Sequence, residues 1–224
     1  MTIGGAASVI SGTAAGARRP GGRSARIRAQ VLEAVRELLV EQGFDALSVD
    51  AVAERAAVHR TTVYRRWRDV GGLLADVLDA AGGDGWEPRD TGTLAGDLAA
   101  VNGEVEAGLT GEPVTAALIA ASFRSAQAAE ALQRFWDERY ERCAVLVERA
   151  LARGEVPEGT CARRVVVAAT APVYQQILLL RGGADPLLAR QAAAAVALAA
   201  SRGLFVVDEA PGQGARAGPG SSTR

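Results

Sequence analysis

The sequence predicts an all-α protein of about nine helices, divided into a small N-terminal domain and a larger C-terminal domain. Apolar residues recur at helical spacing along most of the chain, and no stretch combines period-two alternation with β-branched enrichment. Charge separates the two parts: residues 18–68 contain eleven arginines and six acidic residues, a net charge of +5, whereas the rest carries −6. A basic front and an acidic back are typical of a nucleic-acid-binding module joined to a regulatory body.

Both ends of the chain lack a periodic pattern. Residues 1–22 are rich in Gly, Ala, Ser and Arg, and residues 209–224 repeat this composition. We therefore predict a disordered N-terminal arm and a disordered C-terminal tail. Between them we expect one domain over residues 23–83 and a second over residues 84–208, joined by the glycine-rich loop 82–92.

Four helices are predicted in the first domain. A stripe of apolar residues at i, i+4, i+7, i+8, i+11 and i+12 predicts a helix over about 24–42, with Ser24 as its N-cap and Gly43 at its end. Ser48 is the candidate N-cap of a short second helix. After a tight turn, two further helices are expected near residues 60–67 and 70–81.

The second domain is predicted to be helical throughout. Glycines and prolines divide it into segments, because both residue types end helices readily. The expected helices lie near residues 93–109, 113–124, 126–153, 159–181 and 186–207.

The stretch AVHRTTVYRRW (57–67) has the pattern of a helix-turn-helix. Val63 and Trp67 are four residues apart and would face the first helix, which directs the polar residues outward. Arg can donate two hydrogen bonds to guanine N7 and O6, and Thr offers a hydroxyl and a methyl group to base edges. Tyr can bind a phosphate oxygen, and the helix N-terminus at Ser48 also favours a phosphate. The candidate DNA-contacting residues are Ser48, His59, Arg60, Thr61, Thr62, Tyr64, Arg65, Arg66 and Arg68. The alternative is a solvated basic helix face, but like charges at i, i+4 are mildly unfavourable.

His59 is the only histidine in the chain. Any Ser–His or Cys–His chemistry would have to use it, yet no carboxylate lies near it in the sequence. The chain also has no His/Cys cluster for a metal and no GK[ST] of a phosphate loop. We therefore predict no catalytic residue, no metal and no cofactor, and expect His59 to cap a helix or to meet a phosphate.

Residues 30–67 resemble the N-terminal DNA-binding domain of the tetracycline-repressor (TetR) family. The resemblance rests on Gly43-Phe44, Ser48-Val49, the position of Ala53, and the TxYxxW pattern of Thr62, Tyr64 and Trp67. Two positions depart from the family. His59 stands where Ser or Thr is usual, and residues 67–71 lack the usual lysine at the start of the fourth helix, whose phosphate contact is then missing or taken over by Arg68.

The resemblance implies a dimeric repressor that binds a near-palindromic operator in double-stranded DNA and is released by a small-molecule effector. It also implies a homodimer through the helices near 159–181 and 186–207. The sequence agrees independently, because alanines in residues 189–204 permit close helix approach and residues 165–180 are apolar nearly all round. A buried central helix remains the alternative for residues 165–180.

Candidate residues for an effector pocket are mostly aromatic. Aromatic side chains at helical spacing also fit an ordinary core, and both interpretations stay open. The candidates are Phe123, Gln127, Trp136, Tyr140, Tyr174 and Gln175.

The sequence predicts a cytoplasmic protein without a membrane segment. The N-terminus lacks a signal-peptide pattern, and the apolar run 165–180 is too short to span a bilayer. Cys143 and Cys161 form no CxxC pair, which favours reduced thiols. The rival to a DNA-binding regulator is a helical interaction protein whose helix-turn-helix no longer reads DNA, which the missing lysine favours.

Overall fold

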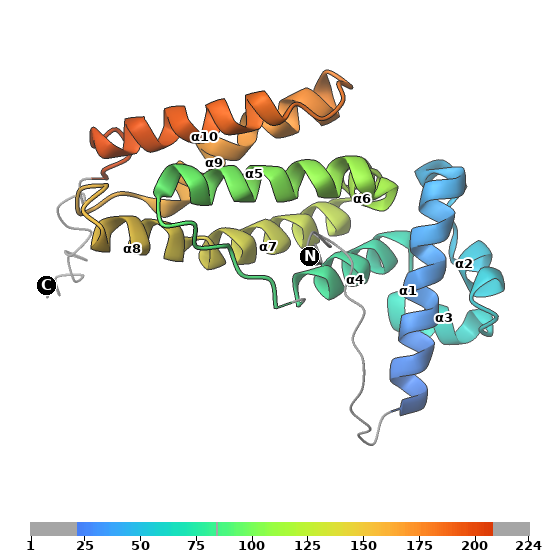
Figure 1. Ribbon diagram of the computed structural model, residues 1–224. Helices are drawn as coiled ribbons and strands as arrows, with labels where there is room; N and C mark the ends of the chain where they lie inside the picture. Colours follow the sequence, from blue (N-terminus) through green and yellow to red (C-terminus); the bar gives the residue numbers. More distant parts are fainter. Residues whose placement is uncertain (1–21, 84, 208–224) are drawn as a thin grey trace, which may run out of the picture.

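The computed structural model describes residues 22–83 and 85–207. This part of the chain contains ten α-helices, two short helical turns and no strand beyond an isolated bridge between Thr160 and Val206. The predicted all-α class is confirmed. Figure 1 shows helices α1 to α4 gathered at one end, with the remaining helices extending away from them. The segments 1–21 and 208–224, where the arm and the tail are expected, lie outside the described residues.

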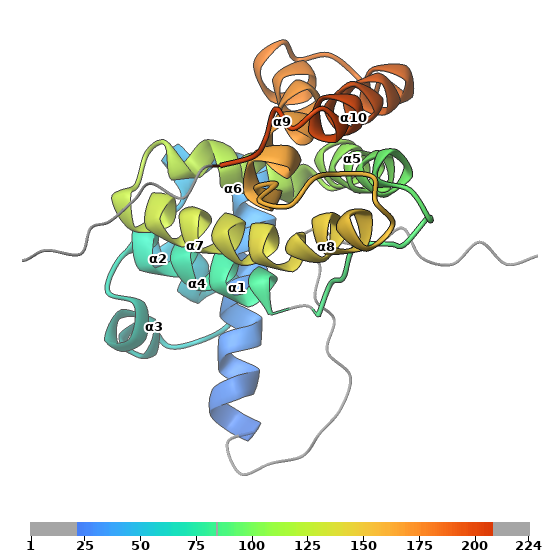
Figure 2. The same ribbon diagram turned by 90° about the vertical axis from the view of Figure 1, so that its left-hand side faces the viewer.

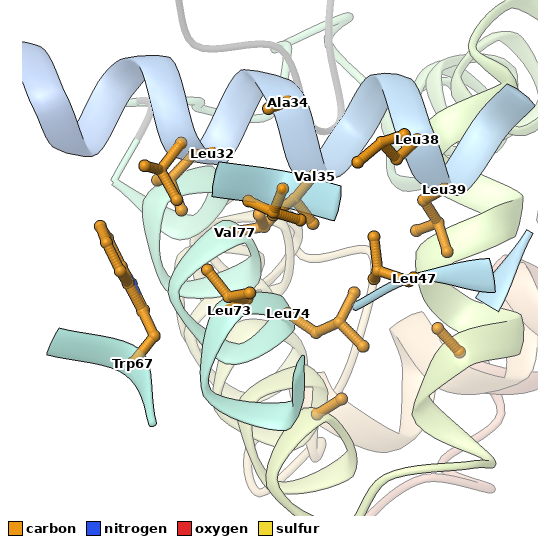
Figure 3. Close-up of a cluster of buried hydrophobic side chains, with 14 of the residues drawn as sticks. Leu32, Ala34, Val35, Leu38, Leu39, Leu47, Trp67, Leu73, Leu74 and Val77 are labelled. Atoms are coloured by element: carbon orange, nitrogen blue, oxygen red, sulfur yellow. The ribbon is translucent and has the colours of Figure 1, made fainter. Parts of the chain in front are cut away.

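Five helical elements form the N-terminal domain around one apolar core. In Figure 3, Leu32 and Val35 of the first helix face Leu73 and Val77 of the fourth, and Trp67 closes one side. Burial of these side chains holds the short helices in place, since each is too short to be stable alone. The elements are α1 (Gly22–Gln42), η1 (Phe44–Ala46), α2 (Val49–Arg55), α3 (Arg60–Trp67) and α4 (Val70–Gly82).

Local signals explain most of these boundaries. Gly43 has a positive φ of 77° after α1, and the Ser48 hydroxyl accepts the Ala51 N–H at 3.1 Å to cap α2. The prediction that Ser24 caps α1 was wrong, because α1 already begins at Gly22 in the described chain. The Ser24 hydroxyl instead accepts a hydrogen bond from Arg66 at 3.4 Å.

The C-terminal domain is a helical bundle with its own core, which includes Leu98, Leu146 and Val165. In Figures 1 and 2, α9 and α10 lie side by side along one outer side of the bundle. None of the described helices is long and apolar enough to cross a membrane. The elements are α5 (Leu94–Gly111), α6 (Pro113–Ser122), α7 (Ala126–Arg142), α8 (Ala144–Ala152), α9 (Ala162–Tyr174), η2 (Gln175–Leu179) and α10 (Pro186–Ser201).

Three helices of this domain differ from their expected spans. The segment 126–153 is interrupted at Cys143, which separates α7 from α8. The segment 159–181 starts only at Ala162 and ends in the π-helical turn η2, which follows Pro172. Proline lacks the N–H that a regular helix needs, so the helix cannot continue unchanged there. The last helix ends at Ser201 instead of near residue 207.

Residues 204–207 pair with the segment before α9 instead of continuing α10. The Cys161 N–H donates to the Phe205 carbonyl at 2.8 Å, and the Val207 N–H donates to the Gly159 carbonyl at 3.1 Å. A buried amide, Asn102 of α5, joins the two outer helices as well. Its Nδ2 donates to the Ala169 carbonyl of α9 and the Ala189 carbonyl of α10, both at 2.9 Å.

The two domains meet where α4 packs along α7 and α1 packs against α6. Arg134 of α7 pairs with Asp79 of α4 at 3.0 Å. Arg142, at the end of α7, donates to the Gly82 carbonyl at the end of α4 and to the Trp86 carbonyl, both at 3.0 Å. The end of α4 and the loop after it are therefore attached directly to the C-terminal domain.

Candidate nucleic-acid interface and cavity

His59 lies at the N-cap of α3, after a tight turn in which Ala57 has a φ of 51°. Its Nδ1 atom is 2.8 Å from the Thr61 hydroxyl and 3.4 Å from the Thr61 amide nitrogen. In the tautomer that carries its proton on Nε2, Nδ1 accepts from both groups and Nε2–H is left as an exposed donor. The histidine thus performs the capping that Ser or Thr performs elsewhere.

Helix α3 has one buried face and one exposed polar face. Val63 is fully buried and Trp67 is 5% exposed, which anchors the helix on the core. Thr62 is half-buried, and Ser48 is exposed at the start of α2. The other candidate residues are all exposed: His59, Arg60, Thr61, Tyr64, Arg65, Arg66 and Arg68.

Ion pairing sorts the arginines of the N-terminal domain into two groups. Arg28, Arg36 and Arg55 bind carboxylates. Their positive charge is therefore largely compensated within the protein. Six others form no salt bridge among the described residues, although Arg66 also acts electrostatically on Asp76. They lie on α3, just after it and at the start of α1: Arg23, Arg26, Arg60, Arg65, Arg66 and Arg68. The uncompensated positive charge therefore gathers at one surface, which suits phosphate binding.

Arg23 and Arg26 were not among the predicted site residues. Both are exposed in the first turns of α1, next to Ser24, whose hydroxyl accepts a hydrogen bond from Arg66 of α3. The excess of positive charge over residues 18–68 was the only sequence signal for them. Which arginines of α1 stay unpaired depends on tertiary contacts, such as the contact of Arg28 with α4.

Asp76 of α4 joins three helices beneath this surface. Arg28 of α1 donates to its carboxylate from Nε at 3.0 Å and from Nη2 at 2.6 Å, and the Trp67 indole N–H of α3 donates at 2.8 Å. Burial acts to raise the pKa of Asp76, but the hydrogen bonds from Arg28 and Trp67 outweigh it and hold the pKa below its usual value. The charged carboxylate thus fixes the end of α3 against α1 and α4.

The connection from α3 to α4 is equally tight. Arg68 has a φ of 62°, and the Asp69 carboxylate accepts the Gly72 N–H at 2.9 Å to cap α4. A Cβ on Gly72 would lie 2.3 Å from the Trp67 carbonyl oxygen, so the close approach requires glycine. Helix α4 begins with half-buried Val70 and has no lysine at its start. The positive charge nearest to this position in the sequence is that of exposed Arg68.

A cavity of about 940 Å³ opens among the helices of the C-terminal domain. Five of the six predicted pocket residues line it: Phe123, Trp136, Tyr140, Tyr174 and Gln175. Gln127 does not, because it lies in the first turn of α7 on the side of α4, where its side-chain oxygen would be 2.6 Å from a Cβ on Gly71. Among the described residues, no group of His, Cys, Asp and Glu side chains could hold a metal ion.

The two domains each match a known family. Residues 31–77 match the model of bacterial regulatory proteins of the tetR family, and residues 88–196 match the tetracyclin repressor-like C-terminal domain. The HTH-type transcriptional regulator AqdR of Rhodococcus erythropolis is 33% identical over 148 residues, which cover 65% of this chain and 71% of AqdR. The chain belongs to the TetR family of transcriptional regulators.

Other transcriptional regulators are also similar to this chain. The HTH-type transcriptional regulator YdeS of Bacillus subtilis is 28% identical over 152 residues, or 66% of this chain and 77% of YdeS. The structure of TetR family regulator SCO0332 covers 77% of this chain and 97% of its own, with 26% identity and a TM-score of 0.58. A TetR regulator of Agrobacterium tumefaciens shares the fold, with a TM-score of 0.61, 21% identity, and coverage of 76% of this chain and 92% of its own.

The family settles the class of activity. Its members are helix-turn-helix regulators that bind DNA and dimerise, and the relatives found are regulators and not enzymes. The predicted DNA-binding regulator is confirmed.

Proposed function

We propose that the protein is a dimeric repressor that binds a near-palindromic operator through α3 and leaves it when a small molecule occupies the cavity. The observation that carries the DNA-binding part is the group of uncompensated arginines around α3. In this proposal Arg60 and Thr61 read base edges at the start of α3, while Tyr64 and Arg68 bind phosphates. Because the target is chromosomal DNA, we place the protein in the cytoplasm.

The proposed dimer forms through α9 and α10. Three large apolar residues on these helices are exposed: Val167 at 40%, Leu187 at 56% and Leu198 at 62%. Leu187 and Leu198 are eleven residues apart, about three helical turns, so both lie on the same face of α10. Burial of this face against a second copy would remove apolar surface from water, which favours a two-fold interface.

The proposed release follows a route from the cavity to α3. Helix α7 contributes Trp136 and Tyr140 to the cavity and packs along α4. Helix α4 is in turn joined to α3 through Asp76 and through the close approach of Gly72 to Trp67. A ligand that favours another position of α7 would change the distance between the two α3 helices of the dimer. Fewer dimers would then have the distance that fits the operator.

A gel-shift titration with DNA from upstream of the protein's own gene tests this function. Arg60→Ala should cost about 1–3 kcal/mol at the base pair it reads and relax sequence preference there, whereas Tyr64→Phe should weaken binding to all sequences alike. Arg202→Ala, which removes an exposed arginine at the end of α10, is the matched control and should leave binding unchanged. Failure to bind any fragment at low salt would refute DNA binding, and equal effects of both α3 variants on all sequences would refute the assigned roles.

A further inference from the structure

We propose that the cavity of the C-terminal domain takes an apolar aromatic ligand that carries an acidic group, and that Arg181 pairs with this group. The inference rests on the proposed function, because it treats this cavity as the effector site.

The side chains that line the cavity indicate an aromatic, apolar ligand. Trp136 stacks on Tyr140 with their ring centroids 6.2 Å apart, and Tyr174 meets Trp136 edge-on at 5.4 Å. These rings present both faces and edges, which suit a flat aromatic molecule. Apolar side chains supply most of the remaining wall, among them Leu109, Ile119, Leu132, Val167, Ile177 and Leu178. The volume of about 940 Å³ lies within the range of drug-sized ligand sites.

The charge of the ligand follows from a single side chain. Arg181 is the one charged residue among those that line the cavity, and no carboxylate accompanies it there. Arg181 also has no ion-pair partner within the described residues. An acidic group would gain a charge-assisted, forked hydrogen bond with the guanidinium. The exposed Arg181 guanidinium would repel a cationic ligand, and no carboxylate in the lining would attract it.

Backbone geometry holds Arg181 at the cavity. The residue follows the π-helical turn η2 and has a φ of 55°. The Gly182 N–H donates to the Gln176 carbonyl at 2.8 Å, and a Cβ on Gly182 would lie 2.2 Å from the Gln176 side-chain nitrogen. The chain therefore closes tightly on η2, whose residues line the cavity, instead of leaving Arg181 on a loose loop. Wide π turns of this kind occur often at functional sites.

Two tyrosine hydroxyls can also donate hydrogen bonds to the ligand. Neither Tyr140 nor Tyr174 has a hydrogen-bond partner for its hydroxyl among the described residues. Burial raises the pKa of both groups, so the hydroxyls remain protonated at neutral pH. A ligand with acceptor oxygens would satisfy these donors, whereas a ligand that offers only donors would not.

Three pyrene probes of nearly equal shape test the charge preference: 1-pyreneacetate, 1-pyrenemethanol and 1-pyrenemethylammonium. Energy transfer from tryptophan to pyrene in the full-length protein reports binding, and Trp136→Phe should reduce this transfer if the probe occupies the cavity. We expect the acetate to bind about tenfold more tightly than the alcohol, and the ammonium probe to bind most weakly.

Variants of two arginines separate the specific pairing from general attraction. Arg181→Gln should lower the affinity for the acetate to that for the alcohol and leave the alcohol unchanged. Arg190→Gln, which removes an exposed arginine of α10 outside the cavity lining, is the matched control and should change neither. The proposal is overturned if no probe binds, if the ammonium probe binds as tightly as the acetate, or if Arg181→Gln has no effect on the acetate.

A gel shift in the presence of each probe keeps the two proposals apart. Acetate binding with the expected order but without release of DNA would overturn effector release and leave the ligand class standing. DNA binding that is released by the ammonium probe would support effector release and overturn the ligand class.

Discussion

Asp76→Ala tests whether one carboxylate holds the reading helix in place. The change leaves the Trp67 indole N–H, in a side chain that is 5% exposed, without the acceptor it meets at 2.8 Å. Hydrogen bonds to charged groups contribute about 1.5–3 kcal/mol. The pair with Arg28, whose side chain is 34% exposed, adds at most about 1 kcal/mol. We therefore expect the free energy of unfolding to fall by roughly 2–4 kcal/mol.

Urea denaturation of matched variants measures this loss. Asp79→Ala removes a carboxylate three residues further along the same helix, but its pair with Arg134 is about half exposed on both sides, so it should cost less than about 1 kcal/mol. Asp76→Asn keeps an acceptor for Trp67 and should fall between the two. DNA affinity, measured where every variant is folded, should also decrease most for Asp76→Ala. If Asp76→Ala costs no more stability than Asp79→Ala, the carboxylate does not hold α3.

Three further predictions concern the same domain. Because folding lowers the pKa of Asp76, the charged carboxylate stabilises the protein fully above about pH 4. This stabilisation is lost as the pH falls through the folded pKa, so the difference in stability between wild type and Asp76→Asn should disappear in acid. A difference that stays constant with pH would contradict this. Gly72→Ala forces a Cβ to within 2.3 Å of the Trp67 carbonyl oxygen and should cost about 1–3 kcal/mol in urea denaturation, whereas Gly83→Ala, with open space around it, should cost far less; equal losses would refute the steric argument. His59→Ala should lower the thermal stability by about 1 kcal/mol and His59→Ser should restore most of it, unless the imidazole has a role besides capping.

Elements with their own start and stop signals were predictable from the sequence. The end of α1 at Gly43, the start of α2 after Ser48 and the start of α3 after His59 each depend on the chemistry of one or two residues. The buried positions of Val63 and Trp67 followed from helical spacing alone. The helix-turn-helix could therefore be recognised without tertiary information.

Features that depend on distant contacts were not predictable. The end of α10 at Ser201 depends on the pairing of Phe205 with Cys161, some forty residues away in the chain. Nothing in the residue types at Cys143 marks the break between α7 and α8. Gln127 could be placed on α7 but not on the correct side of it, because the direction of a helix face depends on which neighbour covers it.

The buried amide of Asn102 has a consequence for how the protein would respond to its own concentration. It ties α9 and α10 to α5, so that the helices proposed to face the partner share one rigid attachment. Helix α9 also forms a wall of the cavity through Val167 and Ala171. In the proposed dimer, the ligand and the second subunit would therefore both contact α9, and Val167 belongs to both surfaces. If the ligand changes the dissociation constant of the dimer, then dimer and monomer must bind the ligand with affinities that differ correspondingly. Dilution, which favours the monomer, would therefore change the ligand concentration needed for a response.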